Sequence, residues 1–195
     1  MPSIKLVFFD LEGTVLCKCS GATETKVAPS SWFTIAQHLG EEALNKEKAT
    51  QVRWNNGEYS GYLEWMEDTI CIHKKYGLKR NVFERILGTV DLMPGAEATF
   101  DSIHSAGVHT ALVTGGFKEQ ACRAGVHLGI RHVYAGCEYF WDEEGRLAFW
   151  NLLPADYHGK VDFVRSVARD YGYCREELAF VGDGQNDVHL VPIQA

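Results

Sequence analysis

Apolar residues follow two different patterns along the chain, and the change between them divides it into three stretches. Residues 4–9 form a short run rich in branched and aromatic side chains, which is typical of a strand buried on both faces. Between residues 31 and 87, apolar side chains recur three and four positions apart, a spacing that predicts helices. We expect four helices here, over residues 31–39, 43–54, 62–73 and 82–87.

From residue 96 onward, helical and strand-like patterns alternate. Three helices and three strands are predicted, the helices over 96–106, 117–128 and 161–171 and the strands over 108–114, 132–135 and 178–181. Residues 139–150 alternate around Asp142-Glu143-Glu144-Gly145, which indicates a hairpin. Strands that alternate with helices predict the α/β class, with a doubly wound parallel sheet.

These patterns predict two domains. Residues 1–16 and 91–195 would form the α/β core, and residues 17–90 an inserted all-helical domain, because the insert shows no strand pattern. Small and polar residues over 17–30 predict a loop at its start. The chain stops shortly after the strand predicted at 178–181, so either its C-terminus is truncated or its sheet is small.

Composition narrows the class of protein and of partner. A chain of 195 residues with 46% hydrophobic and 23% charged residues predicts a globular protein with a sizeable core. The net charge of -7 disfavours nucleic acid or an anionic membrane surface as the main partner. We expect a cytoplasmic protein, since no apolar segment approaches the roughly 20 residues of a membrane span and no signal peptide is evident. The six cysteines form no zinc pattern and predict free thiols that are buried or half-buried.

Asp10 is the first candidate for chemistry. It follows the apolar run and precedes Gly13-Thr14, so it lies at the carboxyl end of a strand, where open α/β sheets bind ligands. A carboxylate there is costly unless it is solvated, paired or bound to a metal. A helix N-cap or a turn is the alternative interpretation.

Two further motifs follow predicted strands. Thr114-Gly115-Gly116 offers a hydroxyl and backbone amides to an anion, although a tight strand-to-helix turn would use the same residues. Asp183 and Asp187, four positions apart in a Gly-rich segment, offer hard oxygen ligands to Mg²⁺. A helix N-cap explains one of these acids but not both.

Lys160 lies at the start of a predicted helix, where a cation runs against the helix dipole. An anion in front of it would explain the position, and simple solvation is the alternative. Because the carboxyl ends of neighbouring strands meet at one edge of the sheet, we expect all four motifs to converge there. Together they supply an acid nucleophile, anion-binding donors, a cation and a metal-binding acid pair, the groups needed for phosphoryl transfer through an aspartyl-phosphate.

In their order along the chain, these motifs resemble those of the haloacid dehalogenase superfamily, and most closely its phosphoserine-phosphatase-like branch. The four motifs are Asp10-Leu11-Glu12-Gly13-Thr14, Thr114-Gly115-Gly116-Phe117, Lys160, and Gly182-Asp183-Gly184-Gln185-Asn186-Asp187. The resemblance covers nearly the whole chain, since the helical insert is similar to the helical cap of that branch.

The resemblance implies a role for each motif. Asp10 would be the nucleophile that attacks phosphorus. Thr114, Gly115 and Lys160 would hold the phosphoryl oxygens, as preorganised donors do in phosphoryl transfer. Mg²⁺ would be held by the carboxylates of Asp10 and Asp183 and the backbone carbonyl of Glu12, with Asp187 bound directly or through water.

Glu12 would be the general acid and base, although most members of this branch have aspartate at that position. Enolase-phosphatase-type members resemble this chain in having glutamate there. The metal role uses the backbone and is unaffected, whereas the carboxylate is one methylene longer and shifts in position.

The implied function is a Mg²⁺-dependent phosphomonoesterase that hydrolyses a small phosphorylated metabolite. Serine-specific members use a Glu and an Arg that by position fall near Cys19 and Thr69 here, which disfavours phosphoserine. Three alternatives stay open: an enolase-phosphatase-like enzyme, a phosphoserine phosphatase, or a fold kept for binding or regulation without turnover. A dehalogenase is disfavoured, because its metal-free chemistry would leave Asp183 and Asp187 unexplained. The sequence gives no indication of the oligomeric state.

Overall fold

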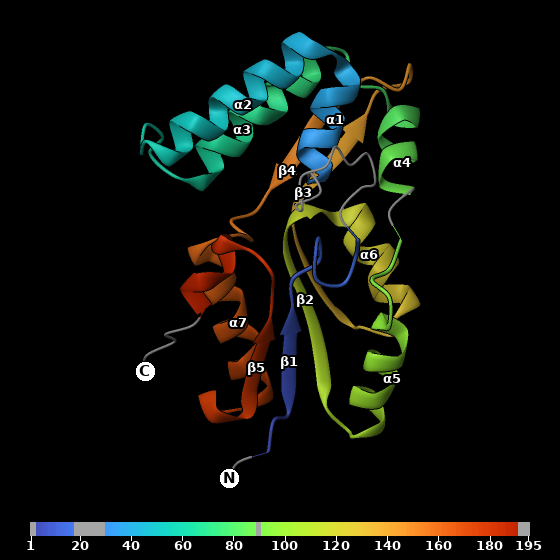
Figure 1. Cartoon of the computed structure of the whole chain (residues 1–195), viewed down its shortest axis with the longest axis vertical. Coiled ribbons are helices and arrows are strands. Elements are labelled where there is room, and N and C mark those ends of the chain that lie inside the picture. Colours follow the sequence, from blue (N-terminus) through green and yellow to red (C-terminus); the bar gives the residue numbers. More distant parts are fainter. Residues whose placement is uncertain (1–2, 18–29, 89–90, 191–195) are drawn as a thin grey trace. The chain divides into compact units, whose positions relative to one another are not determined.

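The computed structural model describes residues 3–17, 30–88 and 91–190, and its contacts separate into two compact units (Figure 1). The first, called the core unit here, comprises Met1–Cys17, Asp91–Gly136 and Pro154–Ala195. The second, the insert unit, comprises Lys18–Val90 and Cys137–Leu153. In the described ranges, no helix has the length and apolar character needed to cross a membrane.

A five-stranded sheet organises the fold, with the strand order β4-β3-β2-β1-β5. The strands are β1 (Leu6–Phe9), β2 (His109–Phe117), β3 (His132–Trp141), β4 (Leu147–Leu152) and β5 (Leu178–Val181). β1 runs parallel to both of its neighbours, with Leu6 opposite His109 on β2 and Leu178 on β5. β4 pairs with β3 in the antiparallel sense. The predicted α/β class with a mostly parallel sheet is therefore confirmed.

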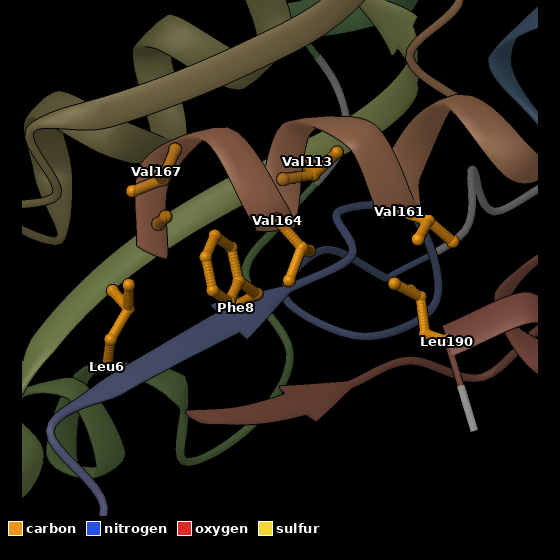
Figure 2. Close-up of a cluster of buried hydrophobic side chains, with 8 residues drawn as sticks. Leu6, Phe8, Val113, Val161, Val164, Val167 and Leu190 are labelled. Atoms are coloured by element: carbon orange, nitrogen blue, oxygen red, sulfur yellow. The ribbon is translucent and has the colours of Figure 1, made fainter. Parts of the chain in front are cut away.

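Helices cover both faces of the parallel strands. On one face, α7 (His158–Tyr171) directs Val161, Val164 and Val167 onto Leu6 and Phe8 of β1, as Figure 2 shows. Phe9, the next residue of β1, faces the other way. The centroid of its ring lies 4.6 Å from that of Phe100 on α5 (Ala96–Ser105). α6 (Lys118–His127) packs against β2. Because successive side chains of β1 point to opposite faces of the sheet and both sets are apolar, helices pack on both faces, which is the doubly wound arrangement.

β2 is longer than predicted. It continues through Thr114, Gly115 and Gly116 to Phe117, whereas the sequence suggested a turn after Thr114. The glycines permit this extension, because a Cβ atom on Gly136 of β3 would lie 2.8 Å from the carbonyl oxygen of Gly115. The two strands approach more closely here than side chains would allow.

The insert unit contains four helices within the described residues: α1 (Ser31–Leu39), α2 (Glu41–Asn55), α3 (Tyr62–Lys75) and α4 (Arg80–Gly88). They cover the four predicted helical segments, with ends that differ by up to two residues. The hydroxyl of Ser30 accepts a hydrogen bond from the amide of Phe33 (3.4 Å) and caps α1. Helix-capping chemistry of this kind is local and is therefore readable from the sequence.

The hairpin formed by β3 and β4 belongs to the insert unit, whereas the predicted domain boundaries placed it in the core. Residues Cys137–Leu153 pack with the insert helices instead. The hydroxyl of Tyr139 lies 2.9 Å from Nδ1 of His73 on α3, and the Phe83 ring on α4 lies 5.2 Å from the Tyr139 ring and 5.3 Å from the Trp141 ring. These buried aromatic contacts, which no local pattern reveals, attach the hairpin to the helices.

The described cysteines are free thiols, but the expectation that they are buried or half-buried holds only for Cys17 and Cys137, since Cys71, Cys122 and Cys174 are exposed. Cys19 lies outside the described residues.

Candidate active site

A buried ion cluster centres on the side chain of Lys160. Its ammonium group donates hydrogen bonds to Oδ1 of Asp10 (2.9 Å) and to Oδ1 of Asp187 (2.6 Å). Oδ1 of Asp156 lies 3.4 Å from the same nitrogen. The lysine is 0% exposed, so these carboxylates replace the water that it has lost.

The packing of α7 explains why Lys160 reaches this position. Lys160, Val164 and Val167 are spaced four and three apart and share one face of the helix. The two valines pack in the cluster that contains Phe8 of β1 (Figure 2), so the same face carries the amine toward the end of that strand. Asp10 follows β1 directly, and its amide donates to the carbonyl of Val181 at the end of β5.

Three carboxylates at this edge of the sheet are arranged as a cation site would require. Asp10, Asp183 and Asp187 each offer one oxygen, and these oxygens lie within 4.8 Å of one another. The amide of Gly184 donates to Oδ2 of Asp187 (3.2 Å), and the hydroxyl of Thr14 donates to Oδ1 of Asp183 (3.4 Å). The donor set consists of hard oxygens and fits Mg²⁺.

The environment shifts the pKa values of the central pair. Burial raises the pKa of Asp10 to about 7, an effect that Lys160 opposes and Asp187 reinforces. Burial acts to lower the pKa of Lys160, but the charges of Asp10, Asp156 and Asp187 outweigh it and hold that pKa above its usual value. The lysine is therefore cationic at neutral pH, whereas Asp10 is only partly ionised there, unlike an ordinary aspartate.

Thr114 and Gly115 lie at the same edge of the sheet. Leu112 of β2 is opposite Phe9 of β1 in the parallel register. The residues that follow Leu112 therefore lie at the same end of the sheet as Asp10, which follows Phe9. The Thr114 hydroxyl is buried and accepts a hydrogen bond from the amide of Gly116 (3.1 Å). A Cβ atom on Gly115 would lie 2.5 Å from Oδ2 of Asp156, which links this residue to the Lys160 cluster.

Glu12 is half-buried, two residues beyond Asp10, in the short turn that follows β1. Its backbone forms an isolated bridge with Leu16. The contacts above tie Asp10, Lys160, Asp183 and Asp187 into one cluster with Gly115 beside it. The predicted convergence of the four motifs is present in the structure, whereas the role of each residue stays a prediction.

Sequence reasoning missed two polar residues of this cluster. Asp156 has no part in the four motifs, yet its Oδ1 accepts hydrogen bonds from Nδ2 of Asn186 (2.7 Å) and from the amide of Tyr157 (3.0 Å). Asp156 precedes α7 and so lies outside the helical spacing that places Lys160, and no sequence signal indicates its position. Asn186 lies inside the acidic motif but was given no role of its own.

Comparison with known families agrees with this architecture. Residues 4–189 match the family of haloacid dehalogenase-like hydrolases. The match covers nearly the whole chain, and the protein therefore belongs to this family. The predicted resemblance is confirmed.

Relatives of known name place the chain near the phosphoserine-phosphatase-like branch. It is 31% identical over 158 residues to a phosphoserine phosphatase of Archaeoglobus fulgidus, a match that covers 78% of this chain and 44% of the relative. It is 28% identical over 157 residues to the phosphoserine phosphatase of Streptococcus thermophilus, covering 78% of this chain and 70% of the relative. The chain thus spans less than half the length of the archaeal relative.

Solved structures share the fold. A haloacid dehalogenase family hydrolase of Salmonella enterica superimposes with a TM-score of 0.77 at 18% identity, covering 97% of this chain and 60% of the other. A substrate-bound phosphoserine phosphatase gives a TM-score of 0.74 at 18% identity, with 97% and 82% covered. At this level of identity, the likeness is evidence for the fold and not for the substrate.

Proposed function

We propose that this protein is a Mg²⁺-dependent phosphomonoesterase that hydrolyses a small phosphorylated metabolite. The observation that carries the proposal is the buried contact of one lysine with Asp10, which directly follows β1, and with Asp187, in the short 3-10 helix after β5. A nucleophilic carboxylate, a fixed cation and a third acid able to share a metal are the groups that phosphoryl transfer needs. A cytoplasmic location stays a prediction from the sequence.

In the first step, an oxygen of Asp10 attacks phosphorus and the bond to the ester oxygen breaks. Glu12 donates its proton to the departing oxygen, which leaves as an alcohol, and Asp10 becomes an aspartyl-phosphate. In the second step, Glu12 takes a proton from water, whose oxygen attacks phosphorus. The bond to Asp10 breaks, inorganic phosphate leaves, and both carboxyl groups return to their starting states.

The remaining residues bind charge. Lys160, the Thr114 hydroxyl and the Gly115 amide would hold the phosphoryl oxygens, donors that commonly contribute about 2.7–4 kcal/mol each to the transition state. Mg²⁺, held by Asp10, Asp183, Asp187 and the Glu12 carbonyl, would offset the repulsion between an anionic nucleophile and an anionic phosphate. Burial is the main cause that raises the pKa of Asp10, so a cation bound beside this carboxylate would favour its ionised, nucleophilic form.

The substrate is proposed only as a class. The relatives are named for phosphoserine, which makes it the first substrate to test. Thr69, which lies near the position of the substrate-binding arginine in serine-specific members, is 2% exposed and donates its hydroxyl proton to the Trp65 carbonyl (3.1 Å). Cys19, near the position of the corresponding glutamate, lies outside the described residues. Thr69 therefore offers phosphoserine no charged group, and other phosphomonoesters belong in the same test.

The test is hydrolysis of p-nitrophenyl phosphate and of a panel of phosphorylated metabolites that includes phosphoserine, with Mg²⁺ present. Asp10→Asn is expected to lower kcat at least about a thousandfold, because an amide oxygen is a poor nucleophile. Asp162→Asn is the matched control, since that exposed carboxylate lies on α7 outside the cluster. Hydrolysis that survives Asp10→Asn would contradict the assignment. Phosphate binding without hydrolysis would favour a protein that binds but does not turn over.

A further inference from the structure

A fourth carboxylate, that of Asp156, lies against the groups expected to bind the phosphoryl oxygens. It accepts a hydrogen bond from Nδ2 of Asn186 (2.7 Å), and it lies 3.4 Å from the Lys160 ammonium. Its Oδ2 also lies 2.5 Å from the point that a Cβ atom on Gly115 would occupy. Since Lys160 and Gly115 are assigned here to the phosphoryl group, an acid in this position requires a reason.

The loop before α7 holds Asp156 in place by an unusual backbone path. Tyr157 has φ 48° and ψ -126°, and it is the only non-glycine residue with positive φ among the described residues. Two positions later, a Cβ atom on Gly159 would overlap the carbonyl oxygen of Pro154. The amide of Gly159 donates to the carbonyl of Asp156 (2.9 Å). Strained backbone of this kind persists where its surroundings enforce it, and it is concentrated at functional sites.

The charges around Asp156 decide what it can do there. Carboxylate and phosphate are both anions that accept hydrogen bonds from ammonium and amide groups. Close to each other they repel, and a donor turned toward one is less available to the other. A purely structural partner for Asn186 would need no negative charge, since a neutral amide oxygen also accepts a hydrogen bond.

We propose that Asp156 is an internal anion that competes with phosphate for the Lys160 and Asn186 donors. This inference rests on the proposed function. Substrate binding would displace the carboxylate from these donors, and its return would weaken the hold on the inorganic phosphate product. Asp156 is thus a residue that sets the affinity for phosphate, not one that takes part in bond making.

The inference is tested by the affinity of the Mg²⁺-loaded full chain for inorganic phosphate, measured by titration calorimetry. Asp156→Asn is expected to lower Kd roughly tenfold, the size of one charged hydrogen bond. Asp156→Ala should shift Kd in the same direction, and it serves if the asparagine variant folds poorly. Asp162→Asn removes the same charge from an exposed position of α7 and should leave Kd unchanged.

Kinetics give a second readout that a merely structural role would not change. Asp156→Asn should lower both KM and the inhibition constant for phosphate, without raising kcat. An unchanged or weaker affinity for phosphate in both variants would overturn the inference and would indicate that Asp156 only positions Asn186. If the wild type hydrolyses no phosphomonoester but the variants bind phosphate more tightly, the phosphatase proposal fails and the present one stands.

Discussion

Glu12 is the residue at which this chain departs from the usual motif of its branch, and its carboxylate is assigned both proton transfers. Glu12→Gln removes the base and leaves Asp10 and Lys160 in place. With p-nitrophenyl phosphate, whose leaving group needs little protonation, the first step should continue. The second step should slow by about 10²–10⁴-fold, the usual contribution of a general base.

The expected result is a burst of p-nitrophenol followed by near-arrest, with the phosphorylated protein visible by intact-mass spectrometry. Glu12→Asp is the control, since it restores the residue usual in the branch and should show no accumulation. Loss of the burst together with the steady state would contradict this expectation, because it would show that the first step needs the Glu12 carboxylate even with this leaving group.

The site residues differ in how far the sequence could predict them. For Lys160 the sequence left an anionic partner and simple solvation open, because a cation in the first turn of a helix opposes the dipole; in the structure its ammonium group contacts Asp10 and Asp187. Asp156 was not predicted, because its direction depends on the positive φ of Tyr157. Neither tyrosine nor its neighbours indicate that conformation, so only the tertiary structure reveals it.

Gly159 connects the loop before α7 to the helix that carries Lys160. Because a side chain on Gly159 would overlap the Pro154 carbonyl, Gly159→Ala forces the backbone to move. We expect a loss of about 1–3 kcal/mol in the free energy of unfolding, the usual cost of an overpacked position. Activity should also fall, and by more than the loss of folded protein explains, because the backbone movement displaces Asp156 and Lys160.

Urea unfolding and assays of phosphomonoester hydrolysis measure the two effects. Gly61→Ala is the matched control, because Gly61 has an extended φ of 178° and a Cβ atom there would meet nothing within 4 Å. Equal tolerance of both substitutions would contradict the described path of the loop.

Whole elements were predictable where local chemistry determines them. Helix α1 lies where the pattern predicted it, because a serine caps its start and a glycine ends it. Strand β5 also lies where it was predicted, because it is a short apolar run. The sequence pattern located the β3–β4 hairpin, but it did not show that the hairpin packs with the insert helices. Tyr139 and Trp141 are apolar on any interpretation, and only their contacts with His73 and Phe83 show that they pack with the insert helices.

For the molecule as a whole, the buried acids link folding stability to pH and to metal. The pKa of Asp10 is about 7 in the folded, metal-free protein against 3.8 for an ordinary aspartate. Between these values the folded state holds a proton that the unfolded state has lost. The stability of the metal-free protein should therefore fall as pH rises from about 4 to about 7, by roughly 4 kcal/mol in total if Asp10 acts alone.

A divalent cation should reverse this trend. Binding of Mg²⁺ favours the ionised form of Asp10, so the stabilisation by Mg²⁺ should be larger at pH 8 than at pH 5, where the ion must first displace a proton. The measurement is the midpoint of thermal unfolding with EDTA or with Mg²⁺ at both pH values. Asp10→Asn should be more stable than the wild type at pH 8 in EDTA, because the uncharged amide avoids the cost of burying a charge. The difference between the two proteins isolates Asp10 from the other acids, and a difference that does not vary with pH would show that this carboxylate is already compensated within the protein.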